Sequence, residues 1–236
     1  MTLLPPHFQR ARSLALVTVL LLLLGGPWVW PAAAGAAEPP SRPQEVVLAG
    51  GCFWCLEHDL ESLPGVLDAE SGYSGGDLPR PTYRQVSAGG TGHQESVRVR
   101  FDPRRTSLEV LLQAYWRNID PLDGAGQFCD RGDSYRPVIF TAGAEQQRLA
   151  VASRRQAARE LGRAESALQV RIQPLSRFWP AEDYHQNYAQ RNALRYGYYR
   201  WACGRDRRLE AVWGPRARTA APWAQAAALG PAASGR

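Results

Sequence analysis

The sequence predicts a domain of the α+β class. Amphipathic helical segments and alternating strand segments follow one another without the regular strand–helix–strand rhythm of a parallel α/β fold. The 236 residues suffice for one full-sized domain and are few for two. The chain also contains no internal repeat.

The first predicted strand and helix meet at two glycines. Residues 45–51, EVVLAGG, predict a short buried strand that ends at this glycine pair. Residues 52–63 then place Phe53, Leu56 and Leu60 at helical spacing, which predicts a helix. Cys52 therefore lies at or near a helix N-terminus.

The remaining elements follow from periodicity and turn residues. Alternating apolar residues and terminating prolines predict further strands, 3.6-residue periods predict helices, and Gly/Asp-rich segments predict loops. We expect strands within 66–76, 93–103, 137–143 and 167–175, helices at 107–119, 144–161 and 180–192, and loops at 77–92 and 120–134.

The two ends of the chain differ in composition from its body. Arg10 and Arg12 precede an apolar run and then the small residues PAAAGAA, the layout of a secretory signal cut after Ala36 or Ala37. We expect residues 1–37 to be this signal, 38–213 the folded domain, and 214–236 a Pro/Ala-rich disordered tail. The expected location is therefore outside the cytoplasm, the periplasm in a bacterium. An uncleaved membrane anchor facing that compartment is the alternative, disfavoured because the apolar run is short for a bilayer.

The formal charge of +6 lies mostly at the ends of the chain. Residues 38–203 contain equal numbers of arginines and acidic residues. This neutral body lacks the basic patch expected of a nucleic-acid-binding protein.

Cys52 and Cys55 predict redox chemistry. Cysteine reacts as a thiolate, and the amides of a helix N-terminus stabilise that form, so the sequence predicts a low pKa for Cys52. Cys55 lies one helical turn further on, within reach of a disulfide with Cys52. Phe53 and Trp54 would form an apolar wall beside the thiol.

Five segments in the same order carry a family resemblance. GGCFWCLE (50–57) is strongly similar to the signature of the A-type peptide methionine sulfoxide reductases, which reduce the S-epimer of methionine sulfoxide. The other segments that resemble the family are GYSGG (72–76), 81–103, 126–140 and 178–188. The resemblance covers about residues 44–213 and implies a two-layer ferredoxin-like sandwich core with long loops.

The resemblance implies a role for each matching residue. Cys52 matches the nucleophile, and Glu95 matches the carboxyl group that protonates the sulfoxide oxygen. Tyr83 and Tyr135 match the hydroxyl groups that hold that oxygen. The residues that match the substrate pocket are Phe53, Trp54, Asp130, His185 and Tyr188.

The expected reaction needs no metal and no organic cofactor. Burial would keep Glu95 protonated, so that it can activate the sulfoxide for attack by Cys52. The resulting sulfenic acid condenses with a second thiol, and a thioredoxin-like dithiol reduces the disulfide.

Many relatives have glycine at position 55 and resolve the sulfenic acid with tail cysteines. We favour Cys55 over Cys203 because helix spacing fixes its geometry, and Cys129 receives no role. We expect a monomer that acts on oxidised proteins or on free methionine sulfoxide.

Three other interpretations use the same cysteines. A thioredoxin-like disulfide exchanger would leave Glu95 and the tyrosines unused. An exported binding module would be stapled by Cys52–Cys55 and Cys129–Cys203. A zinc site is the least favoured, since only half of a paired CxxC arrangement is present.

Overall fold

A computed structural model describes residues 42–222 of the chain. Its strands are β1 (Gln44–Ala49), β2 (Val66–Ser74), β3 (Gln94–Phe101), β4 (Gly126–Gln127), β5 (Asp130–Arg131), β6 (Val138–Thr141), β7 (Arg171–Pro174) and β8 (Phe178–Pro180). Its α-helices are α1 (Phe53–Glu61), α2 (Tyr83–Ser87), α3 (Leu108–Trp116), α4 (Ala144–Glu160), α5 (Tyr188–Arg191), α6 (Ala193–Ala202) and α7 (Arg205–Trp213). Short 3₁₀ turns are η1 (Asp133–Tyr135), η2 (Glu165–Ala167), η3 (Asp183–His185) and η4 (Gly214–Arg216).

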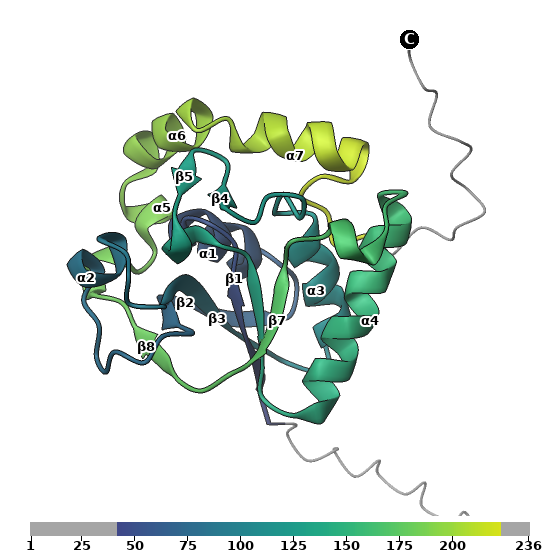
Figure 1. Ribbon diagram of the computed structural model, residues 1–236, viewed down its shortest axis with the longest axis horizontal. Helices are drawn as coiled ribbons and strands as arrows, with labels where there is room; N and C mark the ends of the chain where they lie inside the picture. The colour runs from purple at the N-terminus through teal and green to yellow at the C-terminus, as the bar shows by residue number, and fades with distance from the viewer. Residues whose placement is uncertain (1–41, 223–236) are drawn as a thin grey trace, which may run out of the picture. The chain divides into compact units, whose positions relative to one another are not determined.

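One mixed sheet organises the domain (Figure 1). Its strand order is β7-β6-β1-β3-β2-β8, and every neighbouring pair is antiparallel except β6 and β7. The four central strands, β6-β1-β3-β2, have the order of a ferredoxin-like sandwich, with α1 between β1 and β2 and α3 between β3 and β6. The α+β prediction is therefore confirmed.

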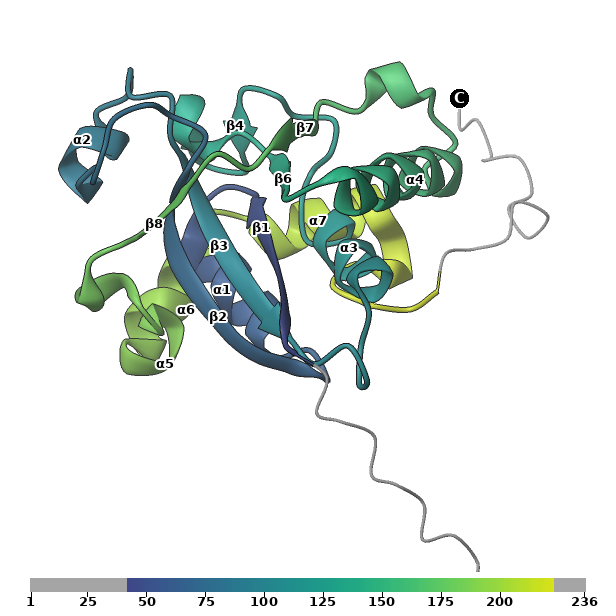
Figure 2. The ribbon, with the colours of Figure 1, turned by 90° about the horizontal axis from the view of Figure 1, so that it is seen from below.

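Helices cover one face of this sheet (Figure 2). Phe53, Leu56 and Leu60 recur every three or four residues along α1, so all three side chains are buried against the sheet. Val97 and Val99 project from β3 into the same cluster, together with residues of α3. Each such side chain contributes about 1.5–3 kcal/mol through burial, which anchors α1, and with it Cys52, to the sheet.

The opposite face of the sheet is covered by the segment that joins β7 to β8 rather than by a long helix. Val47 and Ala49 alternate with the inward residues of β1 and pack with Val138 and Phe140 of β6. Leu175 and Phe178, which flank the turn into β8, close this smaller cluster.

The helices of the structure differ from the sequence prediction in three places. Helix α2 lies inside the expected loop 77–92, and α6 and α7 fill residues for which no element was predicted. The helix expected at 180–192 is divided into η3 and α5 by Asn187, whose φ of 53° lies in the left-handed region.

The expected end of the domain at residue 213 is too early. Residues 214–222 continue over the surface, and Ala217 is buried. The buried guanidinium of Arg117 pairs with Glu160 at 2.9 Å and donates to the carbonyl oxygen of Thr219. The expected signal segment, 1–37, and the last part of the expected tail lie outside the described residues. Within 42–222, no helix is both long and apolar enough to cross a bilayer.

Candidate active site

The glycine pair places Cys52 at the start of α1. Gly51 has a φ of +84°, and a Cβ there would lie 2.6 Å from the Cβ of Gln127. A Cβ on Gly50 would lie 2.7 Å from a methyl group of Ile119. Both positions therefore exclude a larger residue, and the chain turns sharply enough to make Cys52 the N-cap of α1.

A small cavity of about 80 Å³ opens at this turn. Its walls come from α1, α2, β3, the β4–β5 hairpin, η1 and α6. The lining residues are Cys52, Phe53, Trp54, Tyr83, Glu95, Asp130, Tyr135 and Tyr199. The structure thus brings together most of the residues that the resemblance implied.

Glu95 is the buried acid of the cavity. Its side chain accepts a hydrogen bond from the backbone N–H of Phe53 at 3.0 Å, and the residue is 2% exposed. Burial, reinforced by the nearby Asp130 carboxylate, raises the pKa of Glu95 to about 8. At neutral pH the cavity therefore holds a carboxylic acid that can donate a proton.

The two thiols of α1 form a coupled pair. Cys52 and Cys55 are both buried and free, and their side chains are hydrogen-bonded to each other. Burial raises the pKa of the Cys52 thiol, and the negative charges of Cys55 and Glu95 act in the same direction. The hydrogen bond from Cys52, with help from Arg205, lowers the pKa of Cys55.

The predicted low pKa of Cys52 is therefore wrong. The amide next to Cys52, that of Phe53, is committed to Glu95, and the dry cavity penalises a second negative charge. The thiolate of the pair is favoured at Cys55, where two arginines approach.

Two tyrosine hydroxyl groups face Glu95. Burial raises the pKa of Tyr83 to about 12 and also raises the pKa of Tyr135. Both hydroxyl groups consequently stay protonated and can donate hydrogen bonds to an oxygen atom held in the cavity.

Aromatic side chains connect the cavity to a larger groove. Trp54 stacks on Tyr188 with ring centroids 3.7 Å apart, and its indole N–H donates to Nδ1 of His185 at 3.0 Å. The adjoining groove has a volume of about 350 Å³ and is lined by Trp54, Tyr83, Tyr184, His185, Tyr188, Arg195 and Tyr199. His185 and Tyr188 therefore lie in the groove rather than in the small cavity.

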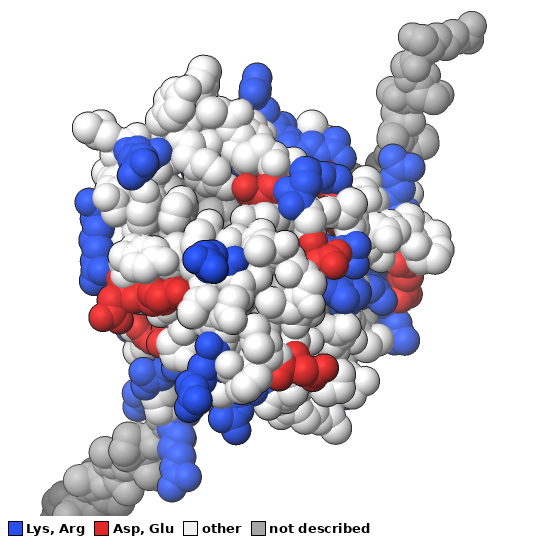
Figure 3. Space-filling model, turned by 60° about the vertical axis from the view of Figure 1, so that its left-hand side comes forward, with Lys and Arg blue, Asp and Glu red and all other residues white. Residues whose placement is uncertain are grey.

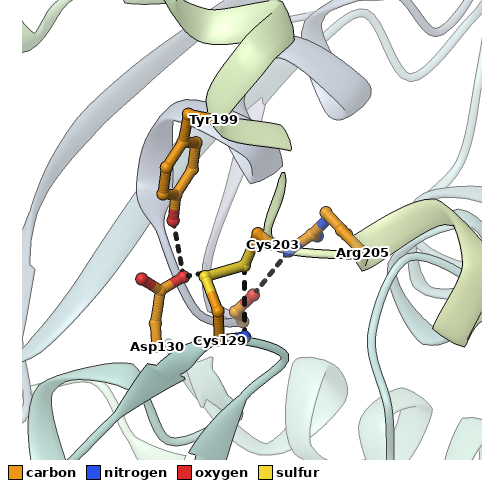
Figure 4. Close-up of a disulfide and its surroundings, with 6 residues drawn as sticks. Cys129, Asp130, Tyr199, Cys203 and Arg205 are labelled. Carbon is orange, nitrogen blue, oxygen red and sulfur yellow. Dashed lines mark hydrogen bonds between the residues drawn. A yellow bond between two sulfur atoms is a disulfide. The ribbon is translucent and has the colours of Figure 1, made fainter. Parts of the chain in front are cut away.

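A disulfide joins Cys129 to Cys203 at the edge of the cavity (Figure 4). It ties the β4–β5 hairpin to the end of α6, across 74 residues of sequence. Asp130, next to this disulfide, accepts a hydrogen bond from the Tyr199 hydroxyl at 2.6 Å. Cys129, which received no role from the sequence, is thus the partner of Cys203. The stapled-module interpretation also required a Cys52–Cys55 disulfide, which the structure does not contain.

Sequence reasoning missed Tyr184 and Arg195 of the groove, and it missed Tyr199 and Glu57. Tyr199 was not recognised as a wall of both cavity and groove, although YGYYRWAC has aromatic residues at helical spacing just before Cys203. Glu57 was also missed: it is buried, accepts a hydrogen bond from Ser71 at 2.7 Å, and accepts another from the Asn187 amide at 2.9 Å. Glu57 therefore fixes α1 to the left-handed turn that begins α5.

Three potential metal ligands meet at one point of the described chain. The ligand atoms of Cys129, Asp130 and Cys203 lie within 4.8 Å of one another. Because both sulfur atoms belong to the disulfide, this cluster offers only one carboxylate as it stands.

Together, a free CxxC thiol pair, a neutral buried acid and phenol donors around one dry cavity define a thiol-dependent oxidoreductase. The profile of the family described as "Peptide methionine sulfoxide reductase" matches residues 44–217. The chain belongs to this family of oxidoreductases, and its similarity extends to the relatives named MsrA.

Individual relatives are similar over most of their length. The chain is 47% identical over 203 residues to peptide methionine sulfoxide reductase MsrA 2 of Caulobacter vibrioides, covering 86% of this chain and 98% of that one. It is 46% identical to MsrA 2 of Rhizobium meliloti, with 86% and 93% covered. The structure of methionine sulfoxide reductase A of Corynebacterium diphtheriae superposes with a TM-score of 0.61 at 32% identity, with 67% and 78% covered.

Proposed function

We propose that this chain reduces the S-epimer of methionine sulfoxide, with Cys52 as the nucleophile. The observation that carries the proposal is the single small cavity in which Cys52, the neutral acid Glu95 and two phenols converge. Phe53 and Trp54 supply apolar surface for the methyl group of the substrate, which would orient one stereoisomer of the sulfoxide toward the thiol.

The first step transfers oxygen from the substrate to Cys52. Glu95 donates its proton to the sulfoxide oxygen, which Tyr83 and Tyr135 hold by hydrogen bonds. The Cys52 sulfur attacks while its own proton passes to the Cys55 thiolate through their hydrogen bond. Methionine leaves, Cys52 carries the oxygen as a sulfenic acid, Glu95 is a carboxylate and Cys55 is a thiol.

The second step forms a disulfide. The Cys55 sulfur attacks the sulfenic sulfur, and the hydroxyl group leaves as water with the thiol proton. A thioredoxin-like dithiol then exchanges with the Cys52–Cys55 disulfide and becomes a disulfide itself. We favour Cys55 over Cys203 as the resolving residue, because Cys55 is hydrogen-bonded to Cys52 whereas Cys203 is bonded to Cys129.

The proposed setting is export and repair of oxidised proteins outside the cytoplasm, with the enzyme as a monomer. The arrangement Arg10, Arg12, apolar run and PAAAGAA supports export, and so does the Cys129–Cys203 disulfide, since disulfides persist in oxidising compartments. Fractionation of cells that express the full chain, followed by mass measurement of the N-terminus, tests cleavage after Ala36 or Ala37.

A stereospecific single-turnover assay tests the chemistry. Purified, pre-reduced enzyme is mixed with each epimer of a sulfoxide peptide and methionine formation is followed without external reductant. We expect methionine from the S-epimer only, and none from either epimer when Cys52 is replaced by serine. Reduction of both epimers at equal rates would contradict the proposal.

A further inference from the structure

The aromatic groove beside the cavity is larger than the reaction requires. The groove holds about 350 Å³, whereas the cavity that contains the reacting groups holds about 80 Å³. The two share Trp54, Tyr83 and Tyr199, so they lie side by side. A methionine sulfoxide side chain in the cavity would leave the groove for whatever is attached to it.

The groove contains a buried hydrogen-bond donor without an acceptor. Nδ1 of His185 accepts from Trp54, and burial lowers the pKa of His185, so the neutral ring carries its proton on Nε2. Nε2 has no hydrogen-bond partner among the described residues, although His185 is 1% exposed. Buried polar groups are normally paired, and a backbone carbonyl group is the commonest acceptor that a polypeptide offers. The ring of Tyr184, which is exposed to solvent, packs against His185 with ring centroids 4.2 Å apart.

The groove also contains one cation. Arg195, in the first turn of α6, is exposed and makes no ion pair or side-chain hydrogen bond within residues 42–222. The other residues that line the groove are aromatic or histidine, so no acidic side chain of the lining balances this charge. Figure 3 turns the side of the molecule that carries α2, α5 and α6 forward: some basic side chains stand alone among uncharged areas, and others lie beside acidic ones.

We propose that Arg195 selects substrates that have an acidic residue close to the oxidised methionine. This inference rests on the proposed function of the neighbouring cavity and concerns which peptide-bound sulfoxides the enzyme prefers. An apolar aromatic floor suits extended chain, the Nε2–H group of His185 suits a backbone carbonyl, and Arg195 suits a carboxylate. A protein reductant is the other macromolecule that must approach the groove. The experiment below distinguishes a substrate peptide from a protein reductant as its occupant.

The experiment compares matched sulfoxide peptides. One set of six-residue S-sulfoxide peptides carries Glu, Gln or Lys at each of the two positions before and after the oxidised residue. N-acetyl methionine sulfoxide amide serves as the minimal substrate. We expect kcat/KM to be highest for a peptide with Glu at one of these positions, about fivefold above its Gln counterpart, and lowest for the minimal substrate.

Substitution of Arg195 tests the charge directly. Arg195→Gln should remove the preference for Glu over Gln, and Arg195→Glu should replace it with a preference for Lys. Arg159→Gln, an equal loss of charge at an exposed position of α4, is the matched control and should keep the wild-type preference.

The outcomes separate this inference from the proposed function. Equal kcat/KM for all peptides and for the minimal substrate, with the S-epimer still reduced, would overturn the groove proposal alone. Loss of the Glu preference in the Arg159→Gln control would overturn the role of Arg195. If Arg195→Gln changed only the KM for a dithiol protein and left peptide selection intact, the groove would belong to the reductant instead. Failure to reduce any S-sulfoxide would overturn the proposed function itself.

Discussion

The chain contains two cysteine pairs that differ in their place in the fold and in their surroundings. Cys52 and Cys55 are three residues apart on α1, buried, and present as free thiols. Cys129 and Cys203 are 74 residues apart, lie nearer the surface, and form a disulfide. The inner pair faces a neutral acid in a dry cavity, whereas the outer pair joins two elements that form the wall of that cavity. These surroundings, rather than the number of thiols, favour the inner pair as the reactive one in the proposed reaction.

The largest expected effect comes from the nucleophile. Cys52→Ser should abolish methionine formation, because a hydroxyl group at this position cannot accept oxygen from the sulfoxide as sulfur does. The measurement is single-turnover release of methionine from an S-sulfoxide peptide. The double variant Cys129→Ser/Cys203→Ser is the control and should still release methionine. Methionine release by Cys52→Ser but not by the double variant would show that the outer pair contains the nucleophile.

The acid beside the inner pair should account for the next largest effect. Glu95→Gln keeps the shape of the side chain but removes its proton, so kcat should fall about 10²–10⁴-fold. Because the pKa of Glu95 is about 8, the activity of the unmodified enzyme should fall as pH rises through that value. The Gln variant should lack this decline. The exposed Glu45, exchanged for Gln, should leave the pH profile unchanged.

Removal of the second inner thiol should limit the enzyme to one turnover. Cys55→Ser should release one methionine per enzyme, more slowly than the wild type, and then stop with Cys52 as a sulfenic acid. A carbon nucleophile that labels sulfenic acids, followed by mass spectrometry, detects this species. Continued turnover in Cys55→Ser that is lost on further replacement of Cys203 would assign resolution to the outer pair.

The outer pair should affect stability more than chemistry. The double variant Cys129→Ser/Cys203→Ser should lower the free energy of unfolding by about 2–4 kcal/mol, since the disulfide closes a long loop. Its KM should rise, because Asp130 and Tyr199 lose the tie that holds their two elements together, while the first turnover persists. Denaturant unfolding and steady-state kinetics measure the two effects. An unchanged KM would show that the Tyr199–Asp130 hydrogen bond holds the wall without the disulfide.

Local pattern made the inner pair predictable from sequence. The glycine pair, the helical period through Leu56 and Leu60, and the CxxC spacing all lie within fifteen residues, so α1 and the position of Cys52 follow directly. Glu95, Tyr83 and Tyr135 come from distant segments, and only the ordered family motifs indicated that they meet.

Features that depend on long-range contacts were not predictable in the same way. The Cys129–Cys203 disulfide requires α6 to lie over the β4–β5 hairpin. The sequence pattern of residues 193–203 does not predict where this helix packs. The pKa of Cys52 was predicted in the wrong direction for the same reason. Its direction depends on burial and on acids from other segments, which outweigh the local amides of α1.

The position of the outer disulfide constrains the electron donor. In the proposed cycle a donor reduces the Cys52–Cys55 disulfide, yet these atoms are enclosed, whereas Cys129 is exposed at the rim. The accessible Cys129–Cys203 disulfide must therefore remain intact while the electron donor repeatedly reduces the enclosed Cys52–Cys55 disulfide. Which disulfide is reduced would accordingly depend on which sulfur atom the donor thiol can reach and align with. The Cys129–Cys203 disulfide would then stay oxidised although the donor reacts close to it.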